Sequence, residues 1–264
     1  MLRLQNESIG DARYGDSPDG LLRLDYPSPA DGTHDWALML PPARGNTWVV
    51  VIHGHGSDGS QLYTRKDVTD AFLPGFLDQG LGVLTPNLRG NAWMSPAAAQ
   101  DLAALLQYLR EKHQAGRFLL AGGSMGGTSN LIYAALHPED ISGVVALCPA
   151  TDLASYCEWC SRCQSGVLRE IHDAIELAYG GSPSAGPDVY SQHSALLRAD
   201  RLRMPVAIVH GAADEIIPVS HSRRLVGAMA DSDSLLYIEI PDGDHESPIH
   251  RFSEAVQWVL DAVK

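Results

Sequence analysis

Short hydrophobic runs, separated by polar and glycine-rich stretches, recur along the chain. Residues 47–53, TWVVVIH, form a largely apolar, β-branched run that is typical of a strand buried on both faces of a sheet. Further strands are predicted at 82–85, 118–120, 141–148, 205–210 and 235–240. Helices are predicted between and after these runs, at about 69–79, from Pro96 onward, and at 125–136, 219–230 and 247–263.

Strands and helices alternate from residue 47 to residue 263. Such alternation implies right-handed crossovers and a mostly parallel sheet covered by helices on both faces. Residues 1–46 are turn-rich instead, and they hold two short candidate strands at 21–26 and 36–40, which we expect to form an antiparallel edge. We therefore predict an α/β fold whose site lies at the carboxyl ends of the parallel strands.

Composition and charge narrow the class of protein. A chain of 264 residues with 45% hydrophobic residues can bury one sizeable core, so we expect a single domain over residues 1–264. The formal net charge of −13, without a basic run or an RNA-binding motif, predicts that neither nucleic acid nor a membrane is a partner. The amino-terminal stretch has no apolar segment of signal-peptide length, and no run approaches the ~18 apolar residues of a membrane span. We expect a cytoplasmic protein, whose oligomeric state the sequence leaves unknown.

Residues 117–127, RFLLAGGSMGG, combine a short strand, a glycine turn and the start of a helix. Ser124 stands at the apex of the turn, within the pattern Gly-x-Ser-x-Gly. In a nucleophile elbow of this kind, the glycines allow a cramped backbone that raises the serine hydroxyl above the sheet. A helix-capping serine is the structural alternative. The strand, turn and helix context favours a nucleophile.

A serine nucleophile needs a base, a carboxylate that holds the base, and donors for the oxyanion. Asp214 follows the strand predicted at 205–210, and His245 follows the strand predicted at 235–240. Both therefore lie on the sheet edge where Ser124 emerges.

Other residues compete for the same roles. Glu215 and Asp152 are the alternative carboxylates, and His250 is the alternative base, although it falls within the pattern of the last helix. His53 and His210 each end a strand before a glycine, and we expect them to be hydrogen-bonded below the site.

The chain order Ser, Asp, His, with one strand between each pair, resembles the α/β-hydrolase fold over about residues 46–264. The motifs HGHG, GGSMGG, HGAADEIIP and GDH are most similar to those of the dienelactone-hydrolase and prolyl-oligopeptidase-like branch. The resemblance implies that Ser124 attacks a carbonyl, that His245 acts as base and then as acid, and that Asp214 orients His245.

The same resemblance implies an oxyanion hole. Its two donors are the backbone N–H groups of Met125, which follows the nucleophile, and of His55 in the HGHG motif, with Gly56 as the alternative to His55.

These features predict a serine carboxylic-ester hydrolase that acts through an acyl-enzyme on small or short-chain acyl esters, without a cofactor. A serine at the elbow argues against the epoxide-hydrolase and dehalogenase branches, which place an aspartate there. A serine peptidase of the prolyl-oligopeptidase-like type is the alternative. Residues 1–46 are too few to form the β-propeller that such peptidases generally carry.

The glycines Gly54, Gly56 and Gly59 also match a dinucleotide-binding fingerprint, which would indicate a nucleotide-binding oxidoreductase. That motif needs an acidic residue at the end of the following strand, and here the strand ends Thr85-Pro86-Asn87. We therefore expect no nucleotide cofactor.

Residues 149–204 exceed what one crossover needs, and we predict that they form a cap or lid insertion over the nucleophile. Tyr156 and Trp159 of this segment, with Trp93 from an earlier loop, are candidates for the substrate pocket, and Ile171 and Ile175 are further candidates for an apolar lid.

The cap segment also contains Cys157, Cys160 and Cys163 in the spacing C-x-x-C-x-x-C. Three thiolates would need a fourth ligand such as Cys148 or His172, and structural zinc sites usually pair two separated C-x-x-C knuckles. Small residues at helical spacing are the simpler explanation, so we expect no metal.

Overall fold

The computed structural model describes residues 3–15, 17–230 and 232–263. The strands within these ranges form one sheet, in the order β1-β2-β3-β5-β4-β6-β7-β8-β9. The strands are β1 (Ser8–Asp11), β2 (Leu22–Pro27), β3 (His34–Leu40), β4 (Thr47–Val51), β5 (Gly82–Pro86), β6 (Arg117–Gly123), β7 (Gly143–Leu147), β8 (Val206–Gly211) and β9 (Leu235–Ile240).

The sheet has an antiparallel edge and a parallel centre. β1, β2 and β3 pair antiparallel, and β3 continues antiparallel onto β5. From β5 across β4, β6, β7 and β8 to β9 every pairing is parallel. The expected mostly parallel α/β sheet with an antiparallel amino-terminal edge is confirmed.

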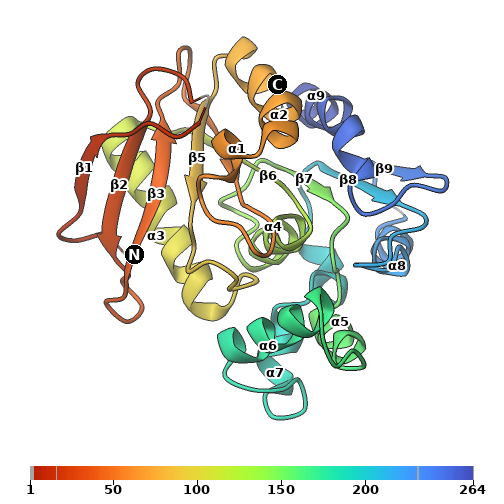
Figure 1. Ribbon diagram of the computed structural model, residues 1–264. Helices are drawn as coiled ribbons and strands as arrows, with labels where there is room; N and C mark the ends of the chain where they lie inside the picture. Colours follow the sequence, from red (N-terminus) through yellow and green to blue (C-terminus); the bar gives the residue numbers. More distant parts are fainter. Residues whose placement is uncertain (1–2, 16, 231, 264) are drawn as a thin grey trace.

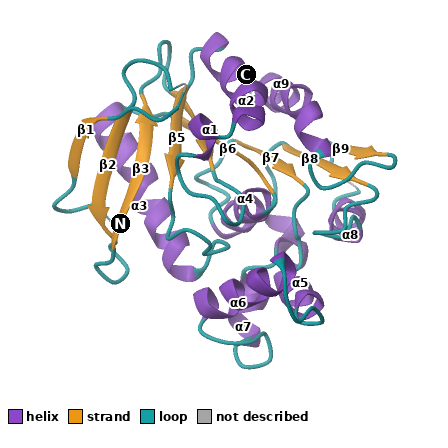
Figure 2. Ribbon diagram, in the orientation of Figure 1, coloured by secondary structure: helices purple, strands orange, loops and turns teal. Residues whose placement is uncertain are grey.

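Two groups of helices cover the faces of the sheet (Figures 1 and 2). The hydrophobic core on one face includes side chains of α3, α4 and α8, and the core on the other face includes those of α1, α2 and α9. The helices are α1 (Gln61–Thr64), α2 (Lys66–Asp78), α3 (Pro96–His113), α4 (Met125–Leu136), α5 (Leu153–Cys160), α6 (Val167–Tyr179), α7 (Pro187–Gln192), α8 (Ser220–Ala228) and α9 (Phe252–Ala262), with 3-10 turns η1 (Ala195–Arg201) and η2 (Ser247–Arg251).

The β-branched run of β4 shows why the sheet is buried on both faces. Successive side chains of a strand point to opposite faces. Trp48 and Val50 belong to the core beneath α3 and α4, whereas Val49 and Val51 belong to the core beneath α2 and α9. All four are at most 6% exposed, and burying each such side chain stabilises the fold by roughly 1.5–3 kcal/mol.

The segment 149–204 adds helices α5, α6, α7 and the turn η1, which the sequence patterns did not predict. In Figure 1, α5, α6 and α7 lie together, apart from the helices that flank the sheet. Short connections with Gly166 and Gly180 at positive φ separate α6 from its neighbours.

Most predicted elements agree with the structure to within a few residues, and the last helix differs in form. The predicted helix 247–263 begins as the 3-10 turn η2, and the α-helix starts only at Phe252. Pro248 lies in the first turn of η2, where its missing N–H is tolerated. The short elements β1 and α1 were not predicted.

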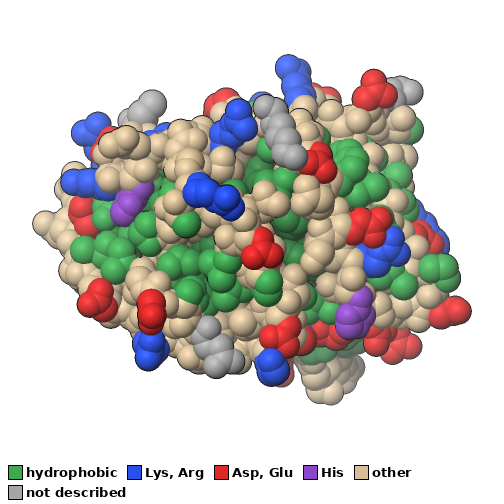
Figure 3. Space-filling model, turned by 90° about the horizontal axis from the view of Figure 1, so that it is seen from above, with side chains coloured by type: hydrophobic (Ala, Val, Ile, Leu, Met, Phe, Trp, Pro, Cys, Tyr) green, Lys and Arg blue, Asp and Glu red, His purple; other side chains and the backbone are tan. Residues whose placement is uncertain are grey.

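Among the described residues, no helix combines the length and the apolar character that crossing a bilayer requires. On the face seen in Figure 3, basic side chains lie scattered among acidic ones and form no continuous patch.

Candidate active site

Ser124 lies in a strained turn between β6 and α4. Its φ of 56° and ψ of −122° are unusual for a residue other than glycine. The Ser124 N–H donates to the Leu147 carbonyl at 2.9 Å, which ties the turn to the neighbouring strand β7. This is the backbone geometry expected for a nucleophile elbow.

The glycines on either side make this turn possible. A Cβ added to Gly126 or to Gly122 would clash with the carbonyl oxygen of Ile52, just beyond β4. Only glycine allows the turn to approach the β4 backbone this closely.

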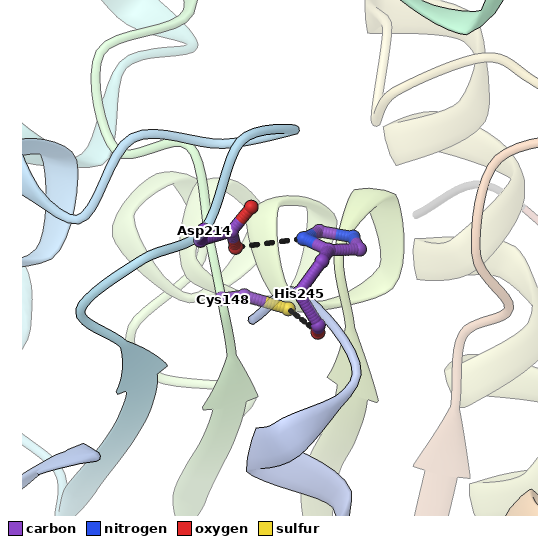
Figure 4. A group of neighbouring side chains, drawn as sticks. All are labelled: Cys148, Asp214 and His245. Atoms are coloured by element: carbon purple, nitrogen blue, oxygen red, sulfur yellow. Dashed lines mark hydrogen bonds and ion pairs between the residues drawn. The ribbon is translucent and has the colours of Figure 1, made fainter. Parts of the chain in front are cut away.

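Asp214 and His245 meet beside the elbow. The Nδ1–H of His245 donates to Oδ2 of Asp214 at 2.7 Å (Figure 4). This bond leaves Nε2 as the unprotonated nitrogen of the neutral ring. His245 and Ser124 both line one cavity, so the ring nitrogen and the hydroxyl share the same space.

Asp214 is held on its other side by its own turn. Its Oδ1 accepts hydrogen bonds from the backbone N–H groups of Ile216 and Ile217, at 2.8 and 2.9 Å. The carboxylate therefore shapes the loop after β8 with one oxygen and holds His245 with the other.

The electrostatics of the pair favour a charged carboxylate. Burial by itself would raise the pKa of Asp214, but hydrogen bonds from His210 and His245 keep that pKa well below its usual range. Burial by itself would lower the pKa of His245, yet the adjacent Cys148 thiol and the Asp214 carboxylate raise it above its ordinary value of 6.5.

The alternative acids and base lie elsewhere. Asp152 caps α5 by accepting from the Ser155 N–H and pairs with Arg224. Glu215 and His250 are exposed and do not line the cavity. The structure therefore brings together the three residues that the sequence favoured, and none of their alternatives.

The loop after β4 contains the expected oxyanion donor His55. The loop is anchored by the Gly54 N–H, which donates to Gln61 Oε1 at 3.0 Å, and by the Gly56 N–H, which donates to Asn91 Oδ1 at 2.8 Å. Within the part of the chain that the structure describes, the N–H groups of His55 and Met125 donate to no protein acceptor. Both are thus available to an oxyanion, whereas the alternative donor Gly56 is already used.

His53 and Gly59 have structural explanations. Both ring nitrogens of His53 contact backbone carbonyls, those of Gly54 and Asn87, at 2.8 and 3.0 Å. A Cβ on Gly59 would come within 2.8 Å of the Thr85 carbonyl. Close packing against the end of β5 therefore accounts for the third glycine of the apparent dinucleotide fingerprint.

The cavity around Ser124 has a volume of about 310 Å³. Two apolar walls flank the serine, one from α2 and η2 and one from α6 and the loop after β8. The apolar lining includes Val68, Phe72, Pro248 and Ile249 in the first wall and Val167, Ile171 and Ile216 in the second. Arg65 and Glu246 also line the cavity, and they form an ion pair with each other.

The three aromatic pocket candidates do not line this cavity, which corrects the expectation from the sequence. Trp93 is buried behind His55, and its Nε1–H donates to His55 Nδ1 at 3.3 Å. Tyr156 is fully buried, stacks on Trp159, and donates its hydroxyl to the Ile216 carbonyl. Trp93 and Tyr156 belong to the hydrophobic core and Trp159 packs against it, whereas Val167 and Ile171 of α6 line the cavity.

Cys148 is a pocket residue that sequence reasoning did not identify. It follows β7, lines the cavity, and donates its thiol hydrogen to the His245 carbonyl at 3.5 Å (Figure 4). The sequence could have indicated this position, because Cys148 ends a predicted strand at the same edge of the sheet as the other site residues.

Comparison with known proteins agrees with this architecture. Residues 47–162 match the model of the alpha/beta hydrolase fold. Strand order, elbow and loop positions all correspond to that fold. The chain has the α/β-hydrolase fold. The chain is 26% identical over 250 residues to the uncharacterized protein YfhR of Salmonella typhimurium, an alignment that covers 88% of the chain and 77% of YfhR.

Solved structures share the fold of this chain. The fluorophosphonate-binding serine hydrolase FphF of Staphylococcus aureus superposes with a TM-score of 0.73 at 15% identity, over 92% of this chain and 99% of FphF. A puromycin-hydrolyzing peptidase of Mycobacterium tuberculosis superposes with a TM-score of 0.68 at 22% identity. That match covers 88% of this chain but only 38% of the peptidase.

Proposed function

We propose that this chain is a serine carboxylic-ester hydrolase that acts on small or short-chain acyl esters through an acyl-enzyme. The observation that carries the proposal is the shared cavity: Ser124, raised on its strained turn, lines the same space as His245, which Asp214 holds at 2.7 Å. The triad residues come from three different strand-end loops, which is the arrangement of this mechanism in the α/β-hydrolase superfamily.

In the proposed reaction, Ser124 Oγ attacks the ester carbonyl while its proton passes to Nε2 of His245. The oxyanion accepts hydrogen bonds from the N–H groups of His55 and Met125. The protonated His245 then gives its proton to the departing alcohol. Water attacks the acyl-enzyme in the second half, with His245 again as base, and the carboxylic acid is released.

The cavity supports a small substrate. Its volume of about 310 Å³ is at the lower end of the range for small-molecule pockets. Its lining includes the apolar side chains of Val68 and Phe72 and those of Ile171 and Ile216. A short acyl chain can bury its apolar surface against these side chains.

A serine peptidase is the second candidate, because the fold is shared with a puromycin-hydrolyzing peptidase. Ester hydrolysis is favoured by the charges around the cavity. Among the described residues that line it, Glu246 is the one acid, and Arg65 pairs with it at 2.5 Å. A carboxylate neutralised in this way is poorly suited to bind the amino group of a peptide substrate.

A matched panel of p-nitrophenyl esters and aminoacyl p-nitroanilides tests the proposal. We expect measurable kcat/KM for the acetyl and butyryl esters, a decline with longer acyl chains, and little or no anilide cleavage. Ser124→Ala should lower ester turnover by at least ~10³-fold. Ser129→Ala, in the helix α4 that follows Ser124 but outside the cavity, is the matched control.

Two results would refute parts of the proposal. If folded Ser124→Ala hydrolysed esters nearly as fast as the parent, Ser124 would not be the nucleophile. Anilides with a higher kcat/KM than the matched esters would replace the esterase assignment with a peptidase.

A further inference from the structure

Three metal-ligating side chains converge between α5 and α6, away from the catalytic serine. Cys157 Sγ lies 3.5 Å from His172 Nδ1, which also lies 3.2 Å from the Cys157 carbonyl oxygen, and the other ring nitrogen, Nε2, lies 3.7 Å from Glu176 Oε2. One ligand atom from each of the three residues lies within 4.8 Å of the other two. His172 and Glu176 are one helical turn apart on α6, so both face the same helix, α5.

The cluster is enclosed but reachable. Cys157 is fully buried and His172 is 8% exposed, whereas a third of the Glu176 side chain is open to solvent. An ion could enter past the carboxylate and meet the sulfur and nitrogen atoms behind it. The hydroxyl of Tyr190 borders the thiol on its inner side.

This set differs from the three thiols that the sequence spacing suggested. Cys163 is not part of the cluster, and Cys148 belongs to the active-site cavity. Cys160 lies beside the Tyr156 hydroxyl. The fold instead brings His172 to a single cysteine and adds Glu176.

We propose that Cys157, His172 and Glu176 form a binding site for one Zn²⁺ ion. A thiolate, an imidazole nitrogen and a carboxylate oxygen are the three ligand types that zinc prefers, whereas Mg²⁺ avoids sulfur. Zinc bonds of about 2.0–2.3 Å in a tetrahedron place ligand atoms about 3.5 Å apart. With one ligand atom from each residue, the separations in the cluster reach at most 4.8 Å, so the partly exposed Glu176 side chain has to move towards the other two ligands when an ion binds.

Binding replaces the S–H bond of Cys157 with a sulfur–zinc bond, and the proton passes to solvent. Water completes the coordination. The ion links α5 to α6, and Ile171, the neighbour of His172, lines the catalytic cavity. The site is independent of the proposed esterase function, because zinc binding is measured without turnover.

The test uses the full chain, dialysed against a chelator and then titrated with ZnCl₂. We expect one zinc per chain by elemental analysis after removal of excess metal, and a rise in thermal midpoint on zinc addition. Cys157→Ser should weaken zinc binding at least ~10-fold, and Glu176→Gln should weaken it by a similar factor while keeping the shape of a partly exposed side chain. MgCl₂ should produce no shift.

Two matched variants locate the ion. Cys163→Ser removes a thiol of the same spacing motif and should bind zinc like the parent. Cys148→Ser removes the thiol beside His245 and should also bind like the parent. A parent that holds no zinc, a Glu176→Gln variant that binds as tightly as the parent, or zinc lost only in Cys148→Ser would each overturn the proposal.

Discussion

His210 and His245 both contact the same carboxylate oxygen, Oδ2 of Asp214. The ring Nε2 of His210 lies 3.2 Å from that oxygen, and the ring is completely buried. Its Nδ1 pairs with the Ser222 hydroxyl at 2.7 Å. Because Ser222 can donate to Nδ1, we assign the His210 proton to Nε2, from which it reaches both Asp214 and the Ile217 carbonyl. His210 is therefore a positioning residue behind Asp214.

Removal of His210 should affect catalysis through the pKa of His245. In His210→Leu, Oδ2 of Asp214 loses one of its two histidine contacts. The negative charge of the Asp214 carboxylate then stabilises protonated His245 more strongly. We expect kcat to fall by about tenfold with little change in KM, and the acidic limb of the kcat profile to move to higher pH. Both are measured with a short-chain p-nitrophenyl ester.

The conservative variant His210→Gln should restore part of the loss, because its amide can donate towards Asp214. Ser222→Ala leaves the Asp214 contact in place and should shift the profile less. If His210→Leu lost activity but kept the parent pH profile, His210 would have only a packing role.

The pH dependence of the parent follows from the raised pKa of His245. Only the neutral ring can accept the Ser124 proton, so kcat/KM should fall as pH decreases through this pKa, with a midpoint above 6.5. Asp214→Asn removes the stabilising charge and should lower the midpoint, with a large loss of rate. A parent midpoint at or below 6.5 would contradict the stabilising effect of the Asp214 contact.

Gly126→Ala should test the close approach of the elbow to β4. The added Cβ would clash with the Ile52 carbonyl, which is backbone and cannot rotate away. We expect the free energy of unfolding to fall by roughly 1–3 kcal/mol and ester turnover to be lost. Gly227→Ala is the matched control, since a Cβ there meets nothing within 4 Å, and it should be neutral or slightly stabilising in urea unfolding.

Ile171→Ala should change which acyl chains are accepted. Ile171 lines the cavity, whereas Ile175, one turn further along α6, is buried and is not part of the lining. The smaller side chain enlarges the pocket, so the ratio of kcat/KM for octanoyl over acetyl esters should rise by about tenfold. Ile175→Ala should lower the thermal midpoint without changing that ratio. Equal ratios in the two variants would show that α6 does not limit acyl length.

The parallel sheet, and the positions of Ser124, Asp214 and His245 at one edge of it, could be predicted because both depend on local patterns. An apolar run such as residues 47–53 indicates a strand that is buried on both faces of a sheet, and the glycines around Ser124 indicate a strained turn. Asp214 and His245 could then be placed, since the carboxyl ends of parallel strands meet at one edge of the sheet.

The pocket lining could not be predicted in the same way. Trp93 and Tyr156 are large and lie in the expected segments, but whether a side chain faces a cavity or the core depends on the packing of α5 and α6. The contact between Cys157 and His172 was equally hidden, because it requires the angle at which two unpredicted helices cross.

Because Gly122 and Gly126 pack against the Ile52 carbonyl, the fraction of correctly folded protein in a preparation can be measured at Ser124. The hydroxyl of Ser124 is presented only when β4 and β6 pair in their native register, with Val51 opposite Ala121. If the pairing of β4 with β6 shifted by one residue, the close approach of Gly122 and Gly126 to the Ile52 carbonyl would be lost. Reaction of Ser124 with a serine-directed phosphonate should therefore titrate natively paired chains, so that labelling stoichiometry measures the correctly folded fraction of a preparation.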